Sequence, residues 1–149
     1  MRLDWVIPCT GVEFRDEGTT IQGAGINCVR VRALPVEIQF TVLLRVVGLT
    51  EDFIEEAPRG VEVYLTGPGL DHLAALEFEV PTGEAPDGYE GWEIWTLMPV
   101  AIKFTAAQLG HHMLDVYLAT DRPKHLVDPG RRRSLPLTIL LEDETPQQR

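Results

Sequence analysis

Residues 36–47 read VEIQFTVLLRVV, and this stretch decides the fold class. Apolar residues stand at every second position, and polar residues stand at most of the positions between them. Because a β-strand turns successive side chains to opposite faces of its sheet, this period predicts a central strand with one buried face. We expect Phe40 and Leu44 in the core. The apolar set consists of Val36, Ile38, Phe40, Val42, Leu44 and Val46.

The same period of two returns along most of the chain. Turns rich in Gly and Pro separate the alternating runs at fairly even spacing, and no helical pattern of ten residues lies between them. We therefore predict an all-β protein, a two-sheet antiparallel β-sandwich of about eight or nine strands, immunoglobulin-like or C2-like. The alternating runs include 3–9, 26–32, 61–65, 74–80, 100–104 and 135–141, together with a hairpin over 12–23.

Residues 106–117 allow two interpretations. An amphipathic helix would gather the apolar residues on one side, but Gly110 interrupts it. We favour a short turn at 105–109 that leads into a strand. That strand would turn inward Leu114, Val116 and Leu118.

Length and charge limit the function classes. The 149 residues predict one domain over 1–141, followed by a polar, flexible C-terminal tail over 142–149. No apolar run approaches the roughly 18 residues of a membrane span, and the first residues lack the apolar core of a signal peptide, so we expect a cytoplasmic protein. The net charge of −10 repels phosphate backbones and anionic lipids. Neither nucleic acid nor a membrane is therefore an expected partner.

Acidic residues are concentrated in 60–102, which hold eight carboxylates and neither Lys nor Arg. Glu84, Asp87 and Glu90 fall in an expected loop, and calcium takes several oxygen ligands from loops. The sequence has no Asp-x-Asp or Asp-x-Asn ladder of the kind that calcium loops use. A calcium-dependent binding sandwich is therefore an alternative and not the leading hypothesis.

The two cysteines, Cys9 and Cys28, form no Cys-x-x-Cys motif. Both lie in expected strands, and Cys28 has the phase of Ile26, which we expect to face inward. We predict two reduced, buried thiols that react slowly with thiol reagents. A disulfide, a reactive thiol and a metal site are the alternatives.

Catalytic and metal-binding motifs do not rise above background. Ser134 is the only serine, and no Gly-x-Ser-x-Gly motif surrounds it. On a strand His111 and Asp115 would share a face about 13 Å apart, too far for one zinc ion, whereas on a helix they would meet. The sequence therefore assigns no catalytic residue, no cofactor and no metal ligand, and it favours a protein that is not an enzyme.

Two tryptophans, Trp92 and Trp95, form the most informative surface feature. Alternation places Trp92 and Trp95 on opposite faces, so with Trp92 in the core Trp95 lies outside, on the side of Leu97 and Glu93. The alternative is that both faces of the sheet are covered here. An exposed apolar pair of this kind marks sites where partners bind. We therefore predict an interaction surface that consists of Trp95, Leu97 and Glu93.

These features favour a non-enzymatic protein-interaction or structural module. Its expected partner is a second copy of the chain, which would give a homodimer, or another protein. The alternatives are a hydrolase or metal-dependent enzyme with a site assembled from loops, and the calcium-dependent sandwich.

Three segments carry a family resemblance. They are residues 3–9 (LDWVIPC), residues 20–26 (TIQGAGI), and Leu34-Pro35 leading into residues 43–46 (LLRV). Together they resemble a family of small uncharacterised bacterial β-sandwich proteins, a domain of unknown function. The resemblance implies a bacterial sandwich fold over most of the chain, and it carries neither an activity nor residue roles.

Overall fold

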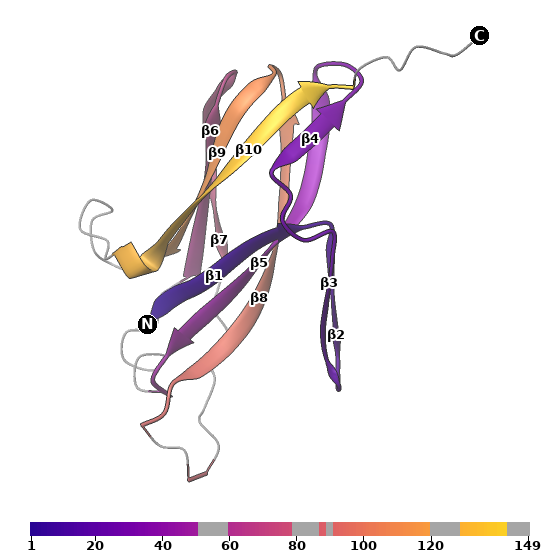
Figure 1. Ribbon diagram of the computed structural model, residues 1–149. Coiled ribbons are helices and arrows are strands. Elements are labelled where there is room, and N and C mark those ends of the chain that lie inside the picture. Colours follow the sequence, from indigo (N-terminus) through magenta and orange to yellow (C-terminus); the bar gives the residue numbers. More distant parts are fainter. Residues whose placement is uncertain (51–59, 79–86, 89–90, 120–128, 143–149) are drawn as a thin grey trace.

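Figure 1 shows the computed structural model, which describes residues 1–50, 60–78, 87–88, 91–119 and 129–142, with backbone alone at 71–78, 119 and 129. Ten strands lie in these residues, so the all-β prediction is confirmed, and the expected strand number was slightly low. The strands are β1 (Arg2–Cys9), β2 (Gly11–Arg15), β3 (Gly18–Gln22), β4 (Cys28–Val31), β5 (Val36–Gly48), β6 (Gly60–Gly67), β7 (Leu70–Phe78), β8 (Ile94–Ala106), β9 (Gly110–Ala119) and β10 (Arg132–Leu141), with one short 3-10 helix, η2 (Pro129–Arg131).

The strands form three sheets. A three-stranded sheet has the order β1-β5-β8, a five-stranded sheet has the order β4-β10-β9-β6-β7, and β2 and β3 form a separate hairpin. All pairs are antiparallel except β4 with β10, which is parallel. The prediction of wholly antiparallel sheets is wrong for this pair, because a period of two carries no information about strand direction.

Strand β5 has the predicted arrangement. Phe40 and Leu44 lie in the core, at 5% and 0% exposure. The inward face of β5 meets inward faces of β6, β9 and β10, so residues of both larger sheets share one core. The largest of the fully buried side chains in this core are those of Leu3, Val42, Leu44, Val46, Val61, Val100, Leu114, Val116, Leu118 and Ile139.

Strand β1 departs from simple alternation. Its register against β5 shifts between Leu3 and Trp5, which marks a β-bulge or similar irregularity. Because such an irregularity inserts one extra residue, it reverses the phase of everything that follows. Leu3 and Val6 therefore belong to the core, while Ile7 and Cys9 do not.

The ambiguous segment after β8 contains a strand. Strand β8 ends at Ala106, residues 107–109 connect, and β9 begins at Gly110. Leu114 and Val116 are buried as predicted. No helix among the described residues is long and apolar enough to cross a membrane.

Candidate interaction surfaces

One side of the three-stranded sheet faces away from the core, and we call it the outer face. The residues on this face are given by the alternation in β5 and β8 and by the shifted phase of β1. Its composition is unusual for a side that should be wetted, because most of its residues are apolar. We keep the name for the part of this side that consists of Trp5, Ile7, Cys9, Thr41, Leu43, Arg45, Val47, Trp95, Leu97, Pro99 and Ala101. Arg2, Glu37, Gln39, Lys103 and Thr105 lie on the same side of the sheet beyond this part.

Burial on the outer face is uneven. Leu43 and Cys9 are completely buried although they belong to no part of the main core. Trp95, on the neighbouring strand β8, keeps 56% of its surface exposed. The centre of the outer face is thus covered, whereas Trp95 on its β8 side is open.

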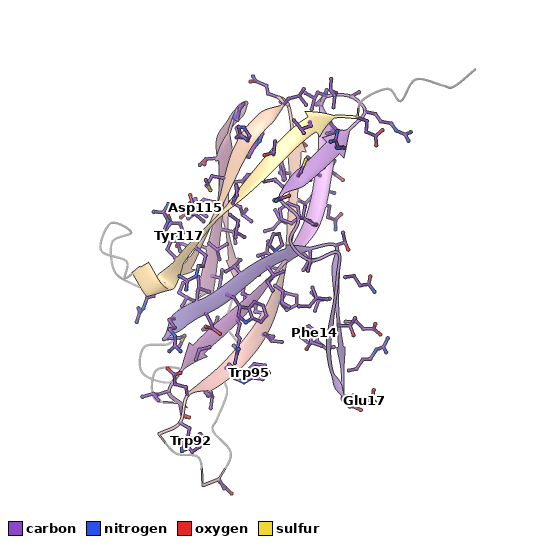
Figure 2. All side chains as sticks on the ribbon, viewed as in Figure 1. Phe14, Glu17, Trp92, Trp95, Asp115 and Tyr117 are labelled. Carbon is purple, nitrogen blue, oxygen red and sulfur yellow. The ribbon has the colours of Figure 1, made fainter. Side chains whose placement is uncertain are left out.

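The β2–β3 hairpin adds a second apolar side. Its register pairs Val12 with Ile21 and Phe14 with Thr19, and opposed residues of a hairpin share one side. Strand β2 contacts β5, and Figure 2 shows Phe14 on the side of the hairpin turned toward the sheet. Phe14 is 52% exposed, so neither it nor Trp95 is covered. Phe14 and Trp95 are therefore two large apolar side chains, one on the hairpin and one on the sheet, that each keep about half of their surface exposed.

The charges on and beside the outer face are paired. The Arg45 guanidinium lies 3.2 Å from an Asp4 carboxylate oxygen and 5.0 Å from the centre of the Trp95 ring. Arg2 makes a two-pronged contact with Glu93, one prong being an Nη2–Oε2 hydrogen bond of 2.9 Å. The hydrogen bond to Glu93 raises the pKa of Arg2.

A third pair lies farther along the same sheet. Lys103 Nζ is 3.0 Å from Glu37 Oε2. Exposed pairs of this kind add little stability. The three pairs do affect the local charge. Three cations and three anions cancel on this side of the sheet, although the net charge of the chain is −10.

Of the predicted surface residues, Trp95 and Glu93 are exposed and Leu97 is half-buried. Trp95 and Leu97 lie on the β8 side of the outer face, and Glu93 lies just before β8 begins at Ile94. Trp92 was predicted in the core, and this is wrong: it is 66% exposed. The reason is that β8 begins only at Ile94, so the alternation does not reach back to Trp92. Ile94 itself packs against the core as predicted.

Sequence reasoning missed Trp5, Phe14 and Arg45 as parts of this surface. The shift in β1 concealed the outward phase of Trp5. A signal was nevertheless present in β5, where apolar residues follow one another at Leu43 and Leu44 and again at 46–47. Consecutive apolar residues in a strand indicate that both of its faces are covered.

The outward side of the five-stranded sheet is polar instead. Asp115 accepts hydrogen bonds from Ser134 and, at 3.0 Å, from Arg132. The Arg132 guanidinium lies 5.3 Å from the Tyr117 ring, which meets Tyr64 edge to face at 5.7 Å. Figure 2 shows Asp115 and Tyr117 close together on this sheet. The hydrogen bond from Arg132 to Asp115 raises the pKa of Arg132.

This polar network does not assemble a catalytic triad. Ser134 donates to a carboxylate directly, and His111, the histidine on the same side, is 3.0 Å from the Thr138 hydroxyl. His111 and Asp115 lie four residues apart on strand β9, as the strand interpretation predicts. Among the described residues no group of three or more His, Cys, Asp or Glu side chains could hold a metal ion. Of the predicted calcium candidates, Glu84 and Glu90 lie outside the described residues.

The two thiols differ. Cys9 is buried as predicted, and burial raises the pKa of its thiol. Cys28 was predicted to face inward, and this is wrong, because it is exposed. Strand β4 begins only at Cys28, and within it Val29 and Val31 take the inward phase, so the phase read from Ile26 does not hold. Both cysteines are free thiols.

An open cleft of about 840 Å³ lies between β4 and β5. Strand β4 and the residues that follow it form one wall, and the first half of β5 forms the other. Arg32 and Glu142 form an ion pair at its rim, 3.0 Å apart. The lining residues are Thr10, Ile26, Cys28–Val31, Arg32, Ala33, Pro35, Val36–Phe40 and Glu142.

Comparison with known proteins adds no relative. A scan against protein-family models and searches of curated proteins and of solved structures found no match for this chain.

Proposed function

We propose that this chain is a non-enzymatic protein-interaction module that pairs with a second copy of itself through the outer face. We further propose that its two larger sheets form a β-sandwich of the immunoglobulin-like or C2-like kind. The shared core of the two sheets supports the sandwich. The exposed Trp95, beside Arg45 on a largely apolar sheet face, is the observation that carries the interaction.

Charge on the outer face permits a second copy as the occupant. Two chains of net charge −10 repel each other at long range. The outer face is the exception, because its ion pairs cancel and two outer faces can approach without net repulsion between them. A two-fold axis through this face would place the Trp95 side chains of both copies in one interface.

Size indicates that the hairpin takes part. The outer face is about 14 Å wide and about 20 Å long, or roughly 300 Å². Stable interfaces bury about 800 Å² on each partner, so the sheet face alone is too small. The apolar side of the β2–β3 hairpin, with Val12, Phe14 and Ile21, supplies additional area next to it.

Sedimentation of two variants tests the proposal. Trp95→Ala removes the exposed aromatic anchor and should shift the chain from dimer to monomer at about 100 μM. Met113→Ala is the matched control, because Met113 is an exposed apolar residue on β9, in the other sheet. It should leave the dimer unchanged. A dimer that is indifferent to Trp95→Ala, or equally weakened by both changes, would overturn the proposal.

A further inference from the structure

Strand β5 is longer than the strand beside it. On one edge β8 pairs with all of Val36–Gly48. On the other edge β1 pairs only as far as Thr41, which lies opposite Cys9. Among the described residues, no strand pairs with Val36–Phe40 on that second edge. About 17 Å of strand edge is therefore available.

This free edge lines the cleft between β4 and β5. Five consecutive residues of β5, Val36–Phe40, line the cleft. Since a strand face presents only every second residue, a consecutive run shows that the cleft lies along the edge. Cys28–Val31 line the opposite wall in the same way, and β10 pairs with the other edge of that strand. The cleft thus lies between one strand edge from each of the two larger sheets.

The position of Pro99 indicates which backbone groups point into the cleft. Pro99 lies opposite Leu43 in the β5–β8 ladder, and a proline has no N–H to give to its neighbour. A proline therefore suits a non-hydrogen-bonded pair, in which the N–H and C=O groups of the two opposed residues point away from each other. In the Leu43–Pro99 pair this directs the N–H and C=O groups of Leu43 away from β8 and toward β1. Along a strand, the backbone groups of every second residue point to the same edge. The N–H and C=O groups of Gln39 and Glu37 therefore point to the same edge as those of Leu43, which beyond the end of β1 is the edge that lines the cleft.

The side chains around the cleft would fit an alternating strand. Toward the core its walls carry buried apolar residues, Val31, Ile38 and Phe40. Toward solvent they carry Gln39 and Glu37, and the latter is paired with Lys103. A strand placed between β4 and β5 would bury every second side chain against the apolar set. Because Arg32 is paired with Glu142 and Glu37 with Lys103, these charges do not select a charged ligand. The ligand would be selected by the spacing of its apolar side chains and by its backbone hydrogen bonds.

We propose that this cleft binds an extended segment of a partner polypeptide, which adds as a β-strand along Val36–Phe40 in line with β1. The ligand class is a strand with apolar residues at alternate positions. Main-chain hydrogen bonds would supply affinity, and the apolar walls would supply specificity. Trp95 does not line the cleft, so this site is separate from the outer face and does not rest on the proposed dimer.

Nuclear magnetic resonance of the ¹⁵N-labelled full chain tests the site. The probe is an acetylated and amidated seven-residue peptide in which threonine and valine alternate. The expected result is saturable shifts at 28–31 and 36–40, with slower hydrogen exchange at the amides of Glu37 and Gln39. In the free protein these two amides should exchange faster than those of Ile38 and Phe40, whose N–H groups point toward β8 in the same ladder.

Two N-methylated versions of the peptide are the controls. One carries the methyl groups on its threonines and the other on its valines, so each removes the N–H groups along one edge without changing the side chains. At least one version should bind about tenfold more weakly, because it loses the hydrogen bonds to β5. Trp95→Ala should bind the unmodified peptide as well as the wild type does.

Three results would overturn the strand-binding cleft. The first is no shift at Val36–Phe40 at millimolar peptide. The second is equal binding of all three peptides, and the third is a set of shifts confined to the outer face.

Discussion

At the residue scale, a glycine and a histidine fit against each other inside the five-stranded sheet. His112 is buried on β9, and its Nδ1 lies 3.1 Å from the carbonyl oxygen of Gly110. A Cβ at Gly67, on β6, would lie 2.7 Å from His112 Cγ. Contacts that close do not occur, so the glycine makes room for the imidazole ring.

Gly67→Ala should therefore destabilise the protein by overpacking. The expected loss in the free energy of unfolding is about 1–3 kcal/mol, measured by denaturant melts. The same change in a His112→Ala background should cost less, because the ring is gone and only the 3.1 Å contact with the backbone Cα of residue 112 remains. Equal costs in both backgrounds would show that the ring is not the obstacle.

The two thiols should react at clearly different rates with a thiol reagent. Cys28 is exposed and should react quickly with a thiol reagent on the native protein. Cys9 should react slowly, because it is buried and burial raises the pKa of its thiol, and the thiolate is the reacting form. Mass spectrometry over time should show one fast label, and Cys28→Ala should abolish it. Two labels at similar rates would contradict the burial of Cys9.

At the element scale, β5 carries the core. Phe40→Ala should lower the free energy of unfolding by about 3–5 kcal/mol through lost transfer energy and the cavity left behind. Gln39→Ala is the matched control on the same strand, and as an exposed position it should change stability by less than about 0.5 kcal/mol. Denaturant melts compare the two. A loss below about 1 kcal/mol for Phe40→Ala would mean that the inward face is wrongly assigned.

The β2–β3 hairpin should be removable without loss of the fold. Thr10 and Gln22 are joined at its base by a backbone hydrogen bond of 2.9 Å, so residues 11–22 can be deleted and Thr10 linked to Gly23. All hairpin residues are at least partly exposed, and we expect the shortened chain to unfold cooperatively. Sedimentation should show that it no longer dimerises. A shortened chain that dimerises like the wild type would exclude the hairpin from the interface.

How far the sequence predicted these elements depends on whether alternation runs unbroken. It does in β5 and β8, and their inward faces followed directly from the period of two. It breaks between Leu3 and Trp5, and it does not extend to Trp92 or from Ile26 to Cys28. Irregularities and strand ends are set by pairing between distant segments, and no local pattern encodes them.

The candidate surfaces were harder to predict than the strands for the same reason. Trp95 and Leu97 could be placed outward from β8 alone. Arg45 lies near them only because β5 pairs with β8. Phe14 lies near them only because the hairpin contacts β5. The cleft depends on where β1 stops along β5, which is a matter of register between strands distant in sequence.

At the scale of the whole molecule, charge decides how two copies meet. A chain of net charge −10 repels its copy over about 30 Å at 0.01 M salt but over only about 8 Å at 0.15 M. The outer face adds no repulsion of its own, because its ion pairs cancel. The dimer should therefore be weaker at low salt, the reverse of an interface held by opposite charges.

Sedimentation equilibrium of the unmodified chain is the most direct test of self-association through the outer face. At about 100 μM and about 0.15 M salt, the account predicts a mass near twice the 16.7 kDa of one chain. At about 0.01 M salt the average mass should fall toward that of the monomer. A mass of 16.7 kDa in both buffers would contradict the account.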